Sequence, residues 1–443
     1  MHIKLSDHFT VKKLLIFTLS SIVMMIFTSI YGVVDGFFIS NYVGKTPFAA
    51  VNFIMPFLMV LGTLGFMFGT GGSALVAKTM GEGKAEKANK IFSMLILVSI
   101  VVGAALTIIG QLTLKPVAEL LGAEGKLLND CVTYGRVVLF AVPVYILQME
   151  FQSFFVTAEK PQLGLMVTVL SGVTNMLLDF LLVAVFPLGL VGAAAATALS
   201  QAVGGIAPLI YFASKNNSLL HITKPDFDGK ALLKTCTNGS SELMSNISMS
   251  LVGMLYNVQL LRLAGENGVA AYGVIMYVNL IFLAAFIGYS IGTAPIISYH
   301  FGAANHAELK SLLKKSLGII STCAVAMLLL ALLLARPLAS LFVGYNAELL
   351  SLTVHGFKIF AFSFLFAGFA IFFSGFFTAL NDGLTSALIS FLRTLVFQIA
   401  AVMLLPLVFD VDGIWISVVV AEFMAVAVGT LFLLLKKNKY KYM

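Results

Sequence analysis

Charged residues are scarce in this chain. Only 11% of its 443 residues are Asp, Glu, Lys or Arg, 60% are hydrophobic, and the mean hydropathy is +1.01. Soluble domains carry about 25% charged residues. The shortage of charge therefore excludes a soluble protein and predicts an all-α membrane protein.

Cysteine is also rare. The three cysteines, Cys131, Cys236 and Cys323, are odd in number and far apart in the sequence. This pattern excludes a disulfide framework and a cysteine-based metal site. The sequence also lacks a nucleophile–base pair or a metal-ligand cluster, so we expect no enzyme and no cofactor. The net charge of +7 lies on a chain without a soluble domain to present it, so we expect no nucleic-acid partner.

Long apolar runs dominate what remains. Twelve segments have the roughly 20 apolar residues that a membrane span needs, among them 14–39, 238–262 and 269–298. The even-numbered loops and both tails hold 19 of the 27 Lys and Arg residues. The positive-inside rule then places both termini in the cytoplasm. We expect a multi-pass membrane protein.

The second half of the chain repeats the first with a displacement of 221 residues. The matches are mostly small or conformationally special residues, such as Gly44 and Gly265, Gly71 and Gly292, Gly81 and Gly302, Pro116 and Pro337, and Gly192 and Gly413. Six spans per half make the two halves parallel in the membrane. We expect an N-terminal lobe at 1–213, a cytoplasmic linker at 214–237 and a C-terminal lobe at 238–443. Such internal repeats are typical of transporters that rock one lobe against the other.

A few polar side chains fall inside the predicted spans. A carboxylate there costs about 2.5–3.5 kcal/mol on insertion scales and indicates function; the five are Asp35, Glu150, Asp179, Glu242 and Glu422. Asn175 precedes Asp179 by one helical turn, and Thr197 in the next span adds a hydroxyl group. Carboxylate, amide and hydroxyl oxygens suit a proton or a hard cation such as Na⁺. The alternative is that Asp35 and Asp179 are helix-end residues satisfied by water.

The repeat bears on that choice because the polar set occurs in one half only. The residues 221 positions later are Tyr256 for Asp35, Val396 for Asn175, Ala400 for Asp179 and Val418 for Thr197. A purely structural network is expected in both halves. We therefore place the coupling site in the N-terminal lobe.

The C-terminal lobe offers two weaker candidates. Glu242 follows a polar stretch, and we expect it at the start of the seventh span, where a helix N-terminus stabilises negative charge. Arg393 lies within a span and is expected to pair with a carboxylate or a backbone carbonyl of the same lobe. Glu422 is a candidate hydrogen-bond partner between helices.

Several motifs resemble the MATE family of multidrug and toxic compound extrusion transporters. They are Val34-Asp35-Gly36, Asn175-Met176-Leu177-Leu178-Asp179, Pro187-Leu188-Gly189-Leu190-Val191-Gly192, Phe377-Thr378-Ala379-Leu380-Asn381-Asp382 and Pro295-Ile296-Ile297-Ser298-Tyr299-His300. The length and the twelve predicted spans resemble the family over the whole chain. The last motif is similar to the bacterial MepA-like and DinF-like branches.

The resemblance implies a cation or proton site built from Asp35, Asn175, Asp179 and Thr197, with Tyr31 and Tyr134 as neighbours. It implies an H⁺- or Na⁺-coupled antiporter that exports amphipathic, often cationic compounds as a monomer in the lipid bilayer of the bacterial plasma membrane. No other cofactor is expected. A lipid-linked glycan flippase of the wider superfamily remains an alternative, and it requires a cationic cavity.

Overall fold

The computed structural model describes residues 3–443, and every regular element in this range is helical. The helices are α1 Val11–Phe38, α2 Lys45–Gly81, α3 Ala85–Leu120, α4 Gly125–Leu139, α5 Val142–Thr157, α6 Pro161–Asp179, α7 Gly189–Ala213, α8 Gly229–Gly302, α9 His306–Val343, α10 Ala347–Phe360, α11 Phe364–Ala379, α12 Gly383–Phe391, α13 Phe397–Leu404 and α14 Pro406–Tyr440. Short π or 3-10 segments are η1 Ile39–Val43, η2 Phe180–Val185, η3 Ala361–Ser363 and η4 Leu392–Val396.

The described residues cross a membrane twelve times. Ten helical segments are long and apolar enough to span, and α4 with α5 makes an eleventh span, bent by 60°. The 74-residue α8 supplies the twelfth because it is two helices joined at Gly265, where φ is 62°. Its repeat mate Gly44 also has a positive φ, 126°, between η1 and α2. Glycine adopts this backbone conformation without steric cost. The twelve-span prediction is confirmed.

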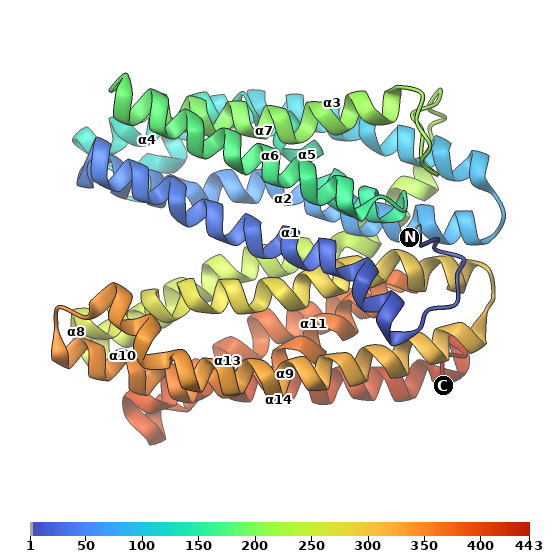
Figure 1. Ribbon diagram of the computed structural model, residues 1–443. Coiled ribbons are helices and arrows are strands. Elements are labelled where there is room, and N and C mark those ends of the chain that lie inside the picture. Colours follow the sequence, from blue (N-terminus) through green and yellow to red (C-terminus); the bar gives the residue numbers. More distant parts are fainter. Residues whose placement is uncertain (1–2) are drawn as a thin grey trace.

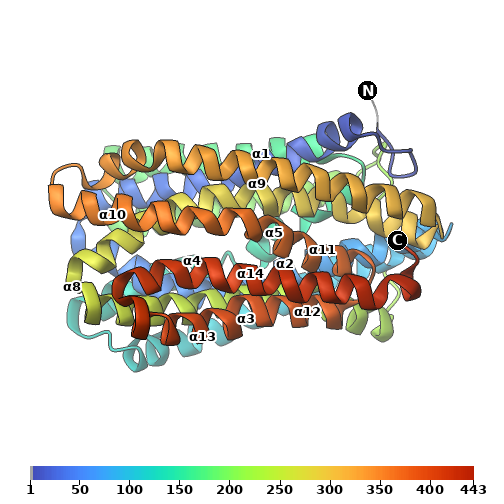
Figure 2. The same ribbon diagram turned by 90° about the horizontal axis from the view of Figure 1, so that it is seen from below.

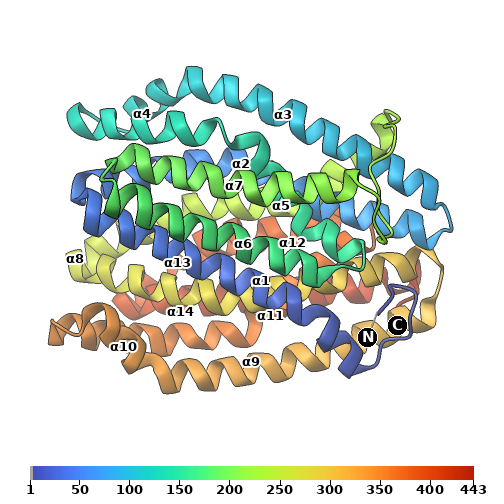
Figure 3. The same ribbon diagram turned by 45° about the horizontal axis from the view of Figure 1, so that its top comes forward.

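The two halves of the chain form two groups of helices. Figure 1 shows the helices of the first half above those of the second, with α1 running along the boundary. Within the first half, α6 lies between α1 and α7 (Figure 3). The first turns of α1 pack against the second half, where Leu14 and Phe17 share an apolar cluster with Phe286 and Leu312. Helix α1 therefore contacts both halves.

Both chain ends lie at the same end of the bundle (Figures 1 and 2), which we call the terminal face. Leu5 near the N-terminus and Tyr440 and Tyr442 near the C-terminus are buried in one apolar cluster. Glu308 at the start of α9 accepts a 2.9 Å hydrogen bond from the Phe9 backbone N–H. A chain with an even number of spans has both of its ends on the same side of the membrane.

The C-terminal tail is anchored at the terminal face by Asp382, in the turn between α11 and α12. Its Oδ2 accepts hydrogen bonds of 2.8 Å from Lys436 Nζ and from the Tyr440 hydroxyl. Burial alone raises the pKa of Asp382, but these bonds and that of Thr385 outweigh it and hold the pKa below its usual value. The carboxylate therefore stays charged and paired with Lys436.

The halves meet along four glycines near the terminal face, Gly71, Gly81, Gly292 and Gly302, which we call the glycine seam. A methyl group on Gly81 would overlap the Tyr299 carbonyl oxygen, and a methyl group on Gly302 would overlap the Lys78 carbonyl oxygen. Lys78 and Tyr299 are themselves 221 residues apart. The two contacts are therefore one contact made twice, across a pseudo-twofold axis.

The other two seam glycines obey the same symmetry. Gly71 packs on the backbone of Gly239, and Gly292 packs on Thr18, the repeat mate of Gly239. Glycine has only a hydrogen atom in place of a side chain. The helices can therefore approach each other at these positions as closely as small residues allow in membranes. The repeat therefore preserved the contact between the halves as well as the fold of each half.

The connector between the halves is shorter than the predicted linker at 214–237. Helix α7 ends at Ala213, and α8 begins at Gly229 with the Asp228 side chain as its N-cap. Glu242 consequently lies more than three turns inside α8, and its expected position at a helix N-terminus is wrong. Asp228, whose carboxylate accepts from the backbone N–H groups of Lys230 and Ala231, is the residue that starts the helix.

Candidate functional site

Two carboxyl groups that are 144 positions apart in the sequence lie together in the first half. Asp35 is near the end of α1 and Asp179 is the last residue of α6, and the two carboxyl groups lie within electrostatic range of each other. Asn175, one turn before Asp179, also contacts Asp35. Asp179 is fully buried and Asp35 is 9% exposed. The structure thus brings three of the predicted site residues together inside one lobe.

Many oxygen atoms of this cluster have no hydrogen-bond partner within the described residues. They are Asp35 Oδ1, both carboxylate oxygens of Asp179, Asn175 Oδ1, Thr197 Oγ1 and the Tyr134 hydroxyl. An unpaired buried polar group costs about 1–3 kcal/mol, and a charged one costs more. The described residues therefore leave these oxygens available to a proton, a cation or water.

Two phenols, one on α1 and one on α4, lie near the carboxyl pair, and a third lies near the first of them. Tyr134 on α4 is fully buried, contacts Thr197 on α7, and lies within electrostatic range of Asp35 and Asp179. Tyr31 lies one turn before Asp35, in range of that carboxyl group and of Tyr145 on α5. The two predicted neighbours and Thr197 are thus next to the pair, and Tyr145 is an additional titratable group there.

The helices change their winding next to both carboxyl groups. Helix α6 passes into the π segment η2 immediately after Asp179, and α1 passes into η1 four residues after Asp35. A π turn leaves backbone groups less tightly paired, and such turns are frequent at functional sites. Each carboxyl group therefore lies next to a π segment, where its helix can change direction.

Two members of this network were not among the residues predicted from the sequence. Gln148 on α5 contacts the Tyr31 side chain, and its Nε2 donates to Ser171 Oγ over 3.3 Å. Ser171 in turn donates to the Ser200 carbonyl oxygen over 2.7 Å. Ser171 lies four residues before Asn175, so extending the helical face of Asn175 and Asp179 by one turn would have found it.

The candidates of the second half form a different arrangement. Arg393 on η4 binds Glu422 on α14 through two nitrogens, with distances of 2.8 to 3.0 Å. The expectation that Arg393 pairs with a carboxylate of its own lobe is confirmed. Glu242 lies within electrostatic range of Arg393. The guanidinium charge is therefore largely compensated inside the lobe.

A neutral pair stands where the first half has Asp35. The hydroxyl of Tyr256, the repeat mate of Asp35, donates to Gln398 Oε1 over 2.7 Å. Its ring stacks on Tyr272 with 5.3 Å between centroids. The two lobes share their backbone plan but differ in polar content, since only the first holds a carboxyl pair at this level.

Comparisons with known proteins agree with this architecture. The sequence model of the MatE family matches residues 20–181 and 243–404, one match in each half. The chain is 26% identical over 417 residues to the multidrug export protein MepA of Staphylococcus haemolyticus, covering 93% of this chain and 90% of that protein. It is 23% identical to MepA of Staphylococcus aureus over 97% of this chain and 94% of that one.

Solved structures share the fold over the whole chain. One is a MATE protein in complex with MaL6, with a TM-score of 0.92, 22% identity and 98% coverage of both chains. Another is the outward-facing conformation of a multidrug resistance MATE family transporter of the MOP superfamily, with the same TM-score, identity and coverage. The similarity to the MepA proteins over nearly the whole chain supports a MepA-like branch. The two family matches, one in each six-span half, establish that this chain belongs to the MATE family.

Proposed function

We propose that this protein is a cation-coupled antiporter that exports amphipathic, often cationic compounds, with H⁺ or Na⁺ as the coupling ion. Its relatives named multidrug export proteins support the substrate class. The observation that carries the coupling is the buried pair Asp35 and Asp179, in which Asp35 Oδ1 and both Asp179 oxygens lack partners among the described residues. The proposed coupling ligands are Asp35, Asn175, Asp179 and Thr197.

Electrostatics explains how such a pair couples ion and substrate movements. Two negative charges about 4 Å apart repel by about 4 kcal/mol at an effective dielectric constant of about 20. One proton or one Na⁺ between the oxygens removes this repulsion, so the two ions compete for the same place. Because Asp35 is on α1 and Asp179 on α6, occupancy changes the force between two helices. A change in that force biases the equilibrium between conformations.

The glycine seam supports alternating access. The halves are in backbone contact near the terminal face, while the repeat mates Gly32 and Gly253, farther from that face, have no atom within 4 Å of a Cβ position. We infer that this conformation is closed at the terminal face. Export requires the seam to open so that substrate can enter from that side.

The glycan flippase alternative receives no support from the second half. A flippase that holds a pyrophosphate headgroup needs uncompensated positive charge, and Arg393 is engaged by both oxygens of Glu422. A bidentate guanidinium–carboxylate pair leaves little capacity for a second anion.

A reconstituted system tests the proposed function. Purified protein in liposomes is expected to move a cationic dye against its gradient when an inward proton or sodium gradient is imposed. Collapse of that gradient by an ionophore is expected to stop transport, and imposing each gradient alone identifies the coupling ion. Dye movement that ignores both gradients would contradict the proposal.

The orientation of the chain is a separate prediction. We expect the terminal face and the connector to be cytoplasmic, because the basic residues concentrate there. In a variant without its native cysteines, Asn217→Cys should resist a membrane-impermeant maleimide added to intact cells. Glu124→Cys, in the exposed turn between α3 and α4 at the other end, should react. The reverse labelling pattern would invert the topology.

A further inference from the structure

Four polar residues form a buried stripe along α6. Thr168, Ser171, Asn175 and Asp179 follow at spacings of three and four residues, so they share one helical face. Each is at most 3% exposed, whereas Met166, Leu170 and Leu177 of the same helix are more than half exposed. The polar face of α6 points into the lobe and its apolar face points to lipid.

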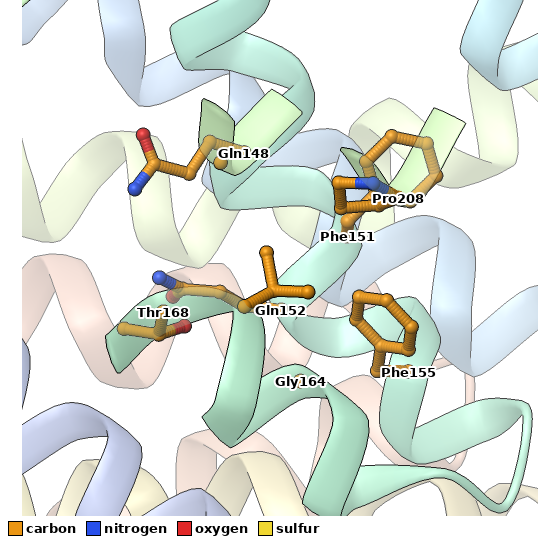
Figure 4. A pocket seen from close by; sticks show the side chains of 9 residues that line it. Gln148, Phe151, Gln152, Phe155, Gly164, Thr168 and Pro208 are labelled. Carbon is orange, nitrogen blue, oxygen red and sulfur yellow. The ribbon is translucent and has the colours of Figure 1, made fainter. Parts of the chain in front are cut away.

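A small cavity lies at the Thr168 end of this stripe. It has a volume of about 10 Å³ and lies between α5, α6 and α7. Figure 4 shows Gln148, Gln152 and Thr168 on one side of it, and Phe151, Phe155 and Pro208 on the other. A volume of about 10–15 Å³ on this measure accommodates one water molecule when polar partners are present.

The amides around the cavity lack partners among the described residues. Gln148 Oε1 and both the Oε1 and Nε2 atoms of Gln152 form no hydrogen bond there, although the two side chains are only 3% and 4% exposed. One water molecule can donate to two oxygens and accept from an N–H group or the Thr168 hydroxyl. The size of the cavity and the polar groups in its walls therefore both fit one water molecule.

One hydrogen bond joins the cavity wall to the polar face of α6. Gln148 reaches from the cavity wall to Ser171, and Asn175, one turn further along α6, contacts Asp35. Gly204 on α7 makes room for this link, because a methyl group there would overlap the Gln148 side chain. A continuous row of polar groups thus runs from Asp179 to Thr168, over about 16 Å at 1.5 Å per residue.

We propose that the cavity holds a bound water molecule and that the row forms a proton path inside the first lobe, between the carboxyl pair and the terminal face. This inference rests on the proposed proton coupling. The O–H bond of the protonated pair breaks, the proton passes to water and leaves through the cavity, and the pair keeps the negative charge. Hydroxyl groups and water carry the proton, and the amides hold the water in position.

The path would let the carboxyl pair exchange protons with the terminal face while the two halves are closed there. The glycine seam joins the two halves by backbone contact at the terminal face, so the helices leave no room for water at the seam glycines themselves. The cavity wall residue Gly164 lies one helical turn from the α5–α6 turn at that face, about 6 Å along the axis. The pair can therefore exchange its proton with that side while the substrate route stays shut.

Thr168→Val tests the path because it removes one hydroxyl group at nearly constant volume. In liposomes, proton movement measured with a pH dye is expected to slow about tenfold, the effect of one lost water contact of about 1.4 kcal/mol. Substrate affinity of the purified variant should not change. Thr174→Val is the control, since that hydroxyl bonds only to Leu170 O of its own helix among the described residues.

Gln152→Leu provides a second, independent variant, and a high-resolution structure of the unmodified protein should show water density beside Gln148 and Gln152. Slower proton movement in both variants with unchanged dye affinity supports the path. Wild-type proton rates in both, or a cavity without water, overturn it. These outcomes concern the path alone. The coupling proposal fails on different results, namely normal transport by the Asp35 and Asp179 variants or dye movement that ignores both ion gradients.

Discussion

Asp35→Asn is expected to abolish gradient-driven efflux while leaving substrate binding intact. The amide imitates the protonated carboxyl group, so the repulsion between Asp35 and Asp179 is permanently removed and the ion gradient no longer changes the balance between conformations. Asp179→Asn is expected to act in the same way. Coupling energies of about 1–3 kcal/mol correspond to factors of about 5–150, so we expect gradient-driven transport to fall about 100-fold. Dye efflux from liposomes and equilibrium dye binding measure the two quantities separately.

The control for this pair comes from a carboxylate at the surface. Asp412, which pairs with His355 outside the buried cluster, is about half exposed, and Asp412→Asn should retain full efflux. Ala400→Asp places a carboxyl group at the repeat mate of Asp179, and it should not restore coupling to Asp179→Asn. Normal gradient dependence in either Asp35→Asn or Asp179→Asn would end the proposed role of the pair.

Gly302→Val is expected to prevent closure at the terminal face. Its Cβ would overlap the Lys78 carbonyl oxygen, and this backbone atom cannot move aside like a flexible side chain. Overpacking of this kind costs about 1–3 kcal/mol, a cost that applies only while the seam is closed. The variant should therefore populate a conformation open at the terminal face, and its efflux should fall.

Spin labels at Glu86→Cys and Lys314→Cys, exposed positions on the two halves near the terminal face, measure this opening. Their distance should increase in Gly302→Val and stay unchanged in Gly318→Val, because Gly318 on α9 has no atom within 4 Å of a Cβ position. An unchanged distance in Gly302→Val, with the protein folded, would show that the seam is not the gate.

The amino-acid sequence alone determined the membrane class, the twelve spans, the repeat and the acidic residues within spans. Each of these follows from local composition or from comparison of the chain with itself. Hydropathy along the chain identifies the segments that prefer lipid. A carboxyl group within such a segment is costly to insert into the membrane, so it can be recognised from the sequence alone. The family resemblance then added the grouping of Asp35, Asn175, Asp179 and Thr197.

Only the tertiary structure decided which polar groups meet. Gln148 and Ser171 belong to the network because α5 packs beside α6, and Arg393 finds Glu422 because η4 lies against α14. The position of Glu242 inside α8 depends on a helix that starts before the apolar run begins. Lateral packing of helices in lipid is set by close backbone approach and interhelical hydrogen bonds. These contacts join residues far apart in sequence, so no local pattern along the chain specifies them.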